Sequence, residues 1–224
     1  MKKYSILLMP AVVALCTYML CRPSAVFPEA YENSMNQEIT NVMNNKTYMF
    51  LADGFEETEA IATLDVMRRS KLDVKTVGVT GKQVTSSHKV TVTADILPDE
   101  LTFENLEGVV LPGGMPGTLN LEKDKSVIQY TKYCFENNKI VAAICAAPSI
   151  LGHLGILKGK KATCFPGFES ELDCKEYTAS HTQTDGLVVT AKGAGCAVEF
   201  GHAIVCLAAS KEAADGVIGD MQCL

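Results

Sequence analysis

The stretch at residues 139–155, "KIVAAICAAPSILGHLG", changes character at Cys145. The residues before this cysteine form a short, wholly apolar run, which is typical of a buried strand in a parallel sheet. Two alanines and then Pro148 follow, and proline is favoured at the first position of a helix. The pattern therefore predicts a strand that passes into a helix within two or three residues, with a cysteine at the turn.

From residue 47 onward the chain alternates between apolar runs and amphipathic segments, which indicates an α/β fold whose mostly parallel sheet carries helices on both faces. A segment at 82–96, "KQVTSSHKVTVTADI", instead alternates β-branched and polar residues, so it predicts a hairpin or edge ribbon outside the parallel core. The expected strands are 47–52, 73–79, 107–111, 139–144, 161–165 and 186–191, and the expected helices are 57–70, 126–138, 148–157, 196–210 and 211–221.

Residues 1–46 have a different composition. Lys2 and Lys3 precede the apolar run "YSILLMPAVVALCTYMLC", and polar, Asn-rich sequence follows it. This pattern predicts a leader at 1–46, a signal or targeting segment with a polar spacer, ahead of a single domain at 47–224. It indicates the secretory route or import into an organelle. A retained membrane anchor is one alternative, and a start of translation near Met43, which would leave the protein cytoplasmic, is another.

Composition narrows the classes of partner and cofactor. The formal net charge is −6, and no large cluster of Lys or Arg occurs, so we expect no nucleic-acid partner. The nine cysteines are an odd number without a Cys-x-x-Cys pair, which favours reduced thiols over a disulfide framework. No metal or nucleotide motif is found: the glycine pair in "KGAGCAVEF" lacks the third small residue, because Val198 stands there.

Three loops follow predicted strands, and such loops form the ligand sites of parallel sheets. They are "ADGFEETE", "LPGGMPGT" and "ICAAPS". At the turn after the last of these strands, the backbone amides and the helix dipole would favour a Cys145 thiolate, as at a nucleophile elbow. A structural cysteine that merely ends a buried strand is the alternative.

The other two loops offer possible partners for that thiol. The first places Glu56, Glu57 and Glu59 at a helix start, where acidic residues also stabilise the helix dipole without any chemistry. One of them could hydrogen-bond the thiolate and transfer a proton, but spacing alone does not choose among the three. The amides of Gly113 and Gly114 could bind an oxyanion or oxidised sulfur, and a plain turn is the alternative. His153 and His202 lie on apolar helices, which favours structural roles.

Four stretches, "FLADGFEETEAIATLDVMRR", "VVLPGGMPGTLNL", "IVAAICAAPSIL" and "GLVVTAKGAGCAVEFGHAIV", resemble in order and spacing the ThiJ/PfpI superfamily, and within it the DJ-one branch of Parkinson-disease-associated deglycase type. The resemblance covers residues 46–219 and implies a flavodoxin-like three-layer fold, a homodimer and no cofactor. It implies that Cys145 is the reactive cysteine and Glu59 its partner. It also implies that the amides of Gly113, Gly114 and Ala146 surround the sulfur.

The activities implied by the resemblance are glutathione-independent conversion of methylglyoxal or glyoxal to hydroxy acids and deglycation of proteins or nucleotides. Oxidative-stress sensing through a Cys145 sulfinate, with chaperone-like action, is the implied alternative without turnover. Ala146 stands where peptidase members carry a histidine, so a Cys-His peptidase is not expected. Phe165 stands where some members carry a histidine near the site, which removes one candidate acid or base.

Overall fold

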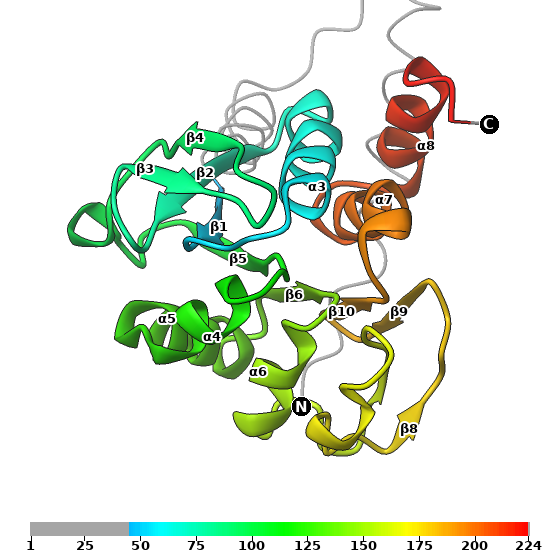
Figure 1. Cartoon of the computed structure of the whole chain (residues 1–224). Helices are drawn as coiled ribbons and strands as arrows, with labels where there is room; N and C mark the ends of the chain where they lie inside the picture. Colours follow the sequence, from blue (N-terminus) through cyan, green and yellow to red (C-terminus); the bar gives the residue numbers. More distant parts are fainter. Residues whose placement is uncertain (1–44, 224) are drawn as a thin grey trace, which may run out of the picture. The chain divides into compact units, whose positions relative to one another are not determined.

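The computed structural model describes residues 45–223, which form a central sheet with helices on both faces (Figure 1). The sheet has six strands in the order β2-β1-β5-β6-β10-β9. Five strands run parallel, and β9 pairs antiparallel with β10 at one edge. Their bounds are β1 (Lys46–Leu51), β2 (Asp73–Gly78), β5 (Leu106–Leu111), β6 (Ile140–Ile144), β9 (Thr182–Asp185) and β10 (Val188–Ala191).

Strand β1 shows why the sheet is covered on both sides. Successive side chains of a strand point to opposite faces, and here both faces are buried. Tyr48 and Phe50 join the core beneath one helical layer, whereas Met49 and Leu51 join the core beneath the other. The first layer consists of α4 (Gly117–Lys123), α5 (Lys125–Glu136) and α6 (Pro148–His153), and the second of α3 (Glu57–Arg69), α7 (Ala197–Ala208) and α8 (Lys211–Asp220).

This arrangement confirms the predicted α/β class and the flavodoxin-like sandwich. The hairpin predicted at 82–96 is also present: β3 (Gln83–Thr85) pairs antiparallel with β4 (Thr91–Thr93), outside the main sheet. The remaining elements are short. They are β7 (Lys161–Ala162), β8 (Glu176–Tyr177), and the 3₁₀ turns η1 (Pro98–Glu100), η2 (Glu169–Glu171) and η3 (Ala194–Cys196).

Two predicted elements have only about half of their expected length or less. The strand expected at 161–165 is only the two-residue β7, which pairs with β8 instead of joining the main sheet. Beyond it, the amide of Thr163 donates to the side chain of Thr190, which interrupts any strand ladder. The helix expected at 148–157 ends at His153, because Gly155 takes a left-handed conformation with φ of 71°.

Among the strands of the main sheet and the helices that cover it, two were not predicted. Helix α4 is only 7 residues long and follows directly on the glycine turn, so it offers too few residues for a helical period. Strand β9, "TQTD", is an edge strand without a buried face and has no apolar alternation. The predicted leader at 1–46 lies outside the described residues, apart from its last two. Among the helices described, none combines the length and apolar character needed to cross a membrane.

Candidate active site

Cys145 sits at the turn between β6 and α6, as the apolar run followed by Pro148 predicted. Its φ is 66°, in the left-handed region that residues other than glycine rarely adopt. Two backbone hydrogen bonds hold this conformation. The Cys145 amide donates to the carbonyl of Ala191 (2.9 Å), and its carbonyl accepts from the amide of Phe165 (2.8 Å). The strain at this turn is therefore sustained by β10 on one side and by the loop after β7 on the other.

Glu59 reaches the same place from α3. The carboxylate of Glu56 caps this helix, since its Oε2 accepts from the Glu59 amide (2.7 Å), and the helix then directs Glu59 inward. Only 1% of Glu59 is exposed. Its carboxyl hydrogen-bonds the Cys145 thiol, and its Oε2 accepts from the Gly113 amide (2.8 Å). Of the three candidate carboxylates, Glu59 alone contacts the thiol.

The glycine turn after β5 closes the site. A Cβ on Gly113 would lie 2.6 Å from the Cβ of Cys145 and 2.8 Å from Oε2 of Glu59, so only glycine fits there. The backbone amides of Gly114 and Ala146 donate to the Cys145 sulfur. The expectation that the Gly113 amide also faces the sulfur is wrong, because that amide is bonded to Glu59 instead. Two of the three expected amides, those of Gly114 and Ala146, therefore surround the sulfur, and the Gly113 amide holds the Glu59 carboxyl in place.

The Glu59 carboxyl titrates far from its ordinary range. Burial raises the pKa of Glu59 to about 7, and the negative charge of Glu56 adds to this, while the hydrogen bonds from Cys145 and Gly113 act in the opposite direction. Near neutral pH, Glu59 is thus able both to give and to take a proton, which is the property required of an acid/base catalyst.

The backbone amides of the turn favour a thiolate, as expected, but other contacts of Cys145 outweigh them. Burial, followed by the charge and hydrogen bond of Glu59, raises the pKa of Cys145. The amides of Gly114 and Ala146 lower it, but α6 has only 6 residues and contributes little dipole. Two acidic groups in contact cannot both ionise easily, so the pair shares one negative charge. The sulfur carries that charge when the proton is on Glu59.

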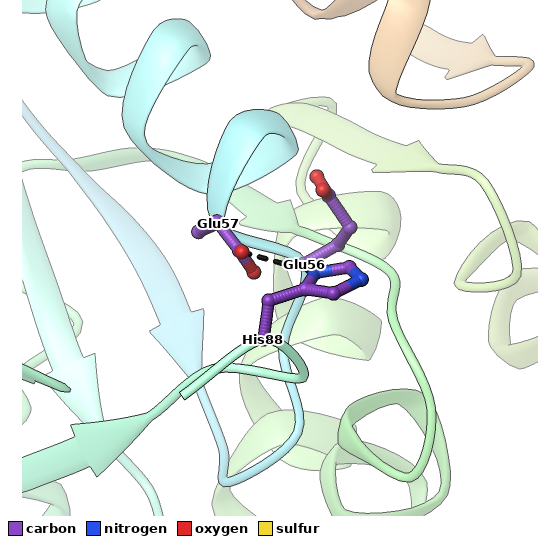
Figure 2. A group of neighbouring side chains, drawn as sticks. All are labelled: Glu56, Glu57 and His88. Carbon is purple, nitrogen blue, oxygen red and sulfur yellow. Dashed lines mark ion pairs between the residues drawn. The ribbon is translucent and has the colours of Figure 1, made fainter. Parts of the chain in front are cut away.

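Glu57, the remaining candidate carboxylate, belongs to a neighbouring cluster with Glu56 and His88 (Figure 2). Glu57 Oε1 pairs with His88 Nδ1 over 2.9 Å, and one ligand-type atom from each of Glu56, Glu57 and His88 lies within 4.8 Å of the others. The Glu56 carboxylate already caps α3 and His88 is largely exposed, so a helix cap and an ion pair account for this group.

Two of the histidines are held by acidic side chains. His153 is held between Glu122 (2.5 Å) and Glu171 (2.8 Å), and His202 pairs with Asp215 (2.8 Å), which fits the structural roles expected for them. The groups that act on the Cys145 thiol are Glu59, Gly114 and Ala146, and no histidine of residues 45–223 is among them.

Comparison with known proteins assigns the family. A family model described as the DJ-1/PfpI family matches residues 45–207. The chain belongs to the DJ-1/PfpI family. The Parkinson disease protein 7 homolog of Danio rerio is 34% identical over 165 residues, which is 71% of this chain and 87% of the zebrafish protein. Protein DJ-1 homolog B of Arabidopsis thaliana is 38% identical over 157 residues, or 69% of this chain.

Solved DJ-1 structures share the fold of this DJ-1/PfpI member. Oxidized Toxoplasma gondii DJ-1 superposes with a TM-score of 0.76 at 28% identity, over 80% of this chain and 98% of that one. Drosophila melanogaster DJ-1beta gives 0.76 at 29% identity, over 80% of this chain and 97% of that one. The matched region spans only 36% and 44% of the lengths of two Arabidopsis DJ-1 homologs, so this chain corresponds to part of those proteins.

Proposed function

We propose that this DJ-1/PfpI member converts small dicarbonyls such as methylglyoxal and glyoxal into hydroxy acids, without glutathione or another cofactor. One observation supports this most strongly. A buried carboxyl with a pKa of about 7 hydrogen-bonds a thiol whose sulfur also accepts from two backbone amides. This combination supplies a nucleophile and a proton carrier in contact with each other, which the isomerisation of a dicarbonyl requires.

In the first step, the proton lies on Glu59 and the negative charge on Cys145. The sulfur attacks the aldehyde carbon, an S–C bond forms, and the carbonyl π electrons move to oxygen. Glu59 gives its proton to that oxygen, which leaves a hemithioacetal and a Glu59 carboxylate. The amides of Gly114 and Ala146 are placed to stabilise the negative charge before and during the attack.

In the second step, the Glu59 carboxylate removes the hydrogen on the former aldehyde carbon as a proton, which gives an enediolate with the negative charge on the neighbouring oxygen and leaves Glu59 protonated. Glu59 returns this proton to the neighbouring carbon, and the hydroxyl proton on the first carbon moves to the neighbouring oxygen, so that the product is a thioester of the hydroxy acid. Water then cleaves the thioester and regenerates the Cys145 thiol. The sum is dicarbonyl plus water to hydroxy acid, with no net oxidation. Deglycation of proteins or nucleotides would use the same residues on the carbonyl adducts of amines or thiols.

The test is turnover in D₂O. The full-length protein is incubated with methylglyoxal, without glutathione, and lactate is analysed by NMR. We expect lactate that carries deuterium on its second carbon, because a Glu59 carboxyl that holds the proton between the two steps exchanges it with solvent. No lactate would overturn the proposed function. Lactate without deuterium would overturn the role of Glu59 as a solvent-exchanging proton carrier.

A second candidate function is sensing of oxidative stress through a Cys145 sulfinate. The same two amides and a protonated Glu59 could donate to sulfinate oxygens, and the superposed Toxoplasma gondii DJ-1 is described as oxidized. Intact-mass analysis after mild peroxide tests this function. A gain of about 32 Da confined to Cys145, the two oxygens of a sulfinic acid, would support it. Oxidation scattered over the other cysteines would contradict it.

A homodimer is also proposed. Ile61 on α3 is 42% exposed and Val90 before β4 is 47% exposed. The two elements lie together, because the Ser87 amide of the hairpin donates to the Phe55 carbonyl just before α3. A second copy would cover these apolar side chains. Light scattering on the full-length protein should give a dimer, and Ile61→Lys should shift it toward monomer; a wild-type monomer would contradict the proposal.

A further inference from the structure

Phe165 is an exposed aromatic residue fixed beside the reactive cysteine. Its amide donates to the Cys145 carbonyl over 2.8 Å, so the position of its backbone relative to the cysteine is set by the turn itself. Phe165 is nevertheless 47% exposed, a high exposure for a phenylalanine. Part of the ring packs on Gly193, where a Cβ would lie 3.2 Å from Cδ2 of the ring. Gly193 thus leaves room for the ring beside it.

Phe165 lines a groove with a volume of about 300 Å³. The walls of the groove are almost entirely carbon. The residues that line it are Phe165, Pro166, His181, Lys192, Gly193, Gly195 and Cys196. A volume of this order is at the lower end of the range for small-molecule sites and accommodates one ring or a short apolar chain.

Backbone hydrogen bonds connect residues at two sides of the groove to Cys145. One wall begins at Phe165, which is bonded to the Cys145 carbonyl. The other begins at Lys192, directly after Ala191, whose carbonyl accepts from the Cys145 amide. These two backbone hydrogen bonds place the groove next to the turn that carries Cys145. Methylglyoxal presents only a methyl group, which leaves such a groove almost empty.

We propose that this groove is a specificity subsite, and that the preferred substrates are α-oxoaldehydes with an aromatic or extended apolar substituent, which stacks on Phe165. This inference rests on the proposed function for its chemistry, although binding to the groove does not. Burying the substituent lowers the free energy of the bound states, because apolar surface leaves water, and ring stacking on Phe165 adds to it. Phe165, which stands where some family members carry histidine, thus has a role in recognition.

The first experiment compares kcat/KM for phenylglyoxal and methylglyoxal, measured as mandelate and lactate. Phe165→Ala should lower kcat/KM for phenylglyoxal about tenfold more than kcat/KM for methylglyoxal, because the substrate's aromatic ring loses most of its burial in the groove. Gly195→Leu should act in the same direction by filling the groove, because a Cβ at Gly195 meets no atom within 4 Å. Phe135→Ala, which removes a 38% exposed phenylalanine on α5, is the matched control and should change neither value. An unchanged ratio in both groove variants would overturn the proposal.

The second experiment separates the groove from the chemistry. Binding of mandelate and lactate to the Cys145→Ser protein is measured by ligand-observed NMR. Mandelate should bind about tenfold more tightly, and adding Phe165→Ala should remove the difference. If mandelate binds more tightly and Phe165→Ala removes the difference, while the wild-type protein shows no turnover, the groove proposal is supported and the proposed function is overturned. If the wild-type protein turns over methylglyoxal but mandelate binds no more tightly than lactate, the groove proposal is overturned and the proposed function is supported.

Discussion

The Glu59 carboxyl hydrogen-bonds the Cys145 thiol, and burial raises the pKa of Glu59 to about 7. The same contact and burial also raise the pKa of Cys145, so neither group ionises independently of the other. The amide of Gly113 holds the carboxyl in this position from the opposite side. The stability and reactivity of the protein should therefore both depend on the proton that this pair shares.

The first prediction concerns the pH dependence of folding stability. With a pKa of about 7 in the folded protein, against 4.5 for an ordinary glutamate in the unfolded chain, Glu59 keeps a proton between these pH values that the unfolded chain has released. The free energy of unfolding should thus fall as pH rises through this window, by on the order of 3 kcal/mol at most. In urea titrations at about pH 5 and about pH 8, Glu59→Gln should show a clearly smaller loss. An equal loss of unfolding free energy between these pH values in the wild type and Glu59→Gln would contradict the raised pKa of Glu59.

The second prediction concerns Glu56. Its negative charge contributes to the raised pKa of Glu59, and its carboxylate also caps α3. Glu56→Gln removes the charge and keeps an oxygen acceptor for the cap, so the pH at which Cys145 becomes reactive should fall by less than about one unit. The measurement is the rate of Cys145 alkylation by iodoacetamide against pH. Glu57→Gln is the matched control, because Glu57 pairs with His88 instead. It should leave the pH midpoint of Cys145 alkylation unchanged. A Glu56→Gln midpoint equal to that of the wild type would show that the charge of Glu56 does not reach the pair.

The third prediction concerns Gly113. The Cβ of Gly113→Ala would lie 2.6 Å from the Cβ of Cys145 and 2.9 Å from the carbonyl oxygen of Ile144, so the β6 turn must move. We expect a loss of about 1–3 kcal/mol in the free energy of unfolding, typical of overpacking, and a large loss of Cys145 alkylation. Gly216→Ala on α8 is the control, because a Cβ there meets no atom within 4 Å, and it should be neutral or slightly stabilising. Equal effects of the two substitutions would argue against a tightly packed site.

Much of this arrangement follows from the sequence because its signals are local. The apolar run 140–144 and Pro148 predict the strand and the helix on either side of Cys145. The alternation of polar and β-branched residues predicts the hairpin. Strand β9 gives no such signal, because "TQTD" lies at an edge where only the backbone pairing with β10 defines it.

The inner details of the site depend on contacts between distant segments. Spacing alone left three carboxylates as candidates, and only the inward direction of Glu59 from α3 separates it from Glu56 and Glu57. The bond from Gly113 to Glu59 joins residues 54 positions apart, and no local pattern reports it. The raised pKa of Cys145 likewise depends on burial beside a carboxyl, and the residues of the turn alone do not reveal that carboxyl.

The fourth prediction concerns His153, which ties α6 to Glu122 and Glu171. Hydrogen bonds to these two carboxylates raise the pKa of His153 above its usual value. Its contribution to stability should be fully present below the unfolded-state pKa of about 6.5, and should be lost as pH rises through the higher folded-state pKa. The difference in melting temperature between wild type and His153→Gln should thus narrow from about pH 6 to about pH 9. A difference that stays constant or widens would show that the protonated form is not the stabilising one.

The central claim is that Cys145 and Glu59 together turn over dicarbonyls, and substitution of the sulfur tests it most directly. The full-length wild type, Cys145→Ser and Cys206→Ser are assayed for lactate from methylglyoxal without glutathione; Cys206, a partly buried thiol on α7, provides the control. We predict that Cys145→Ser loses at least about a thousandfold in kcat/KM, since serine is a far weaker nucleophile at neutral pH, and that Cys206→Ser keeps wild-type activity. Lactate formation by Cys145→Ser at the wild-type rate would contradict the account.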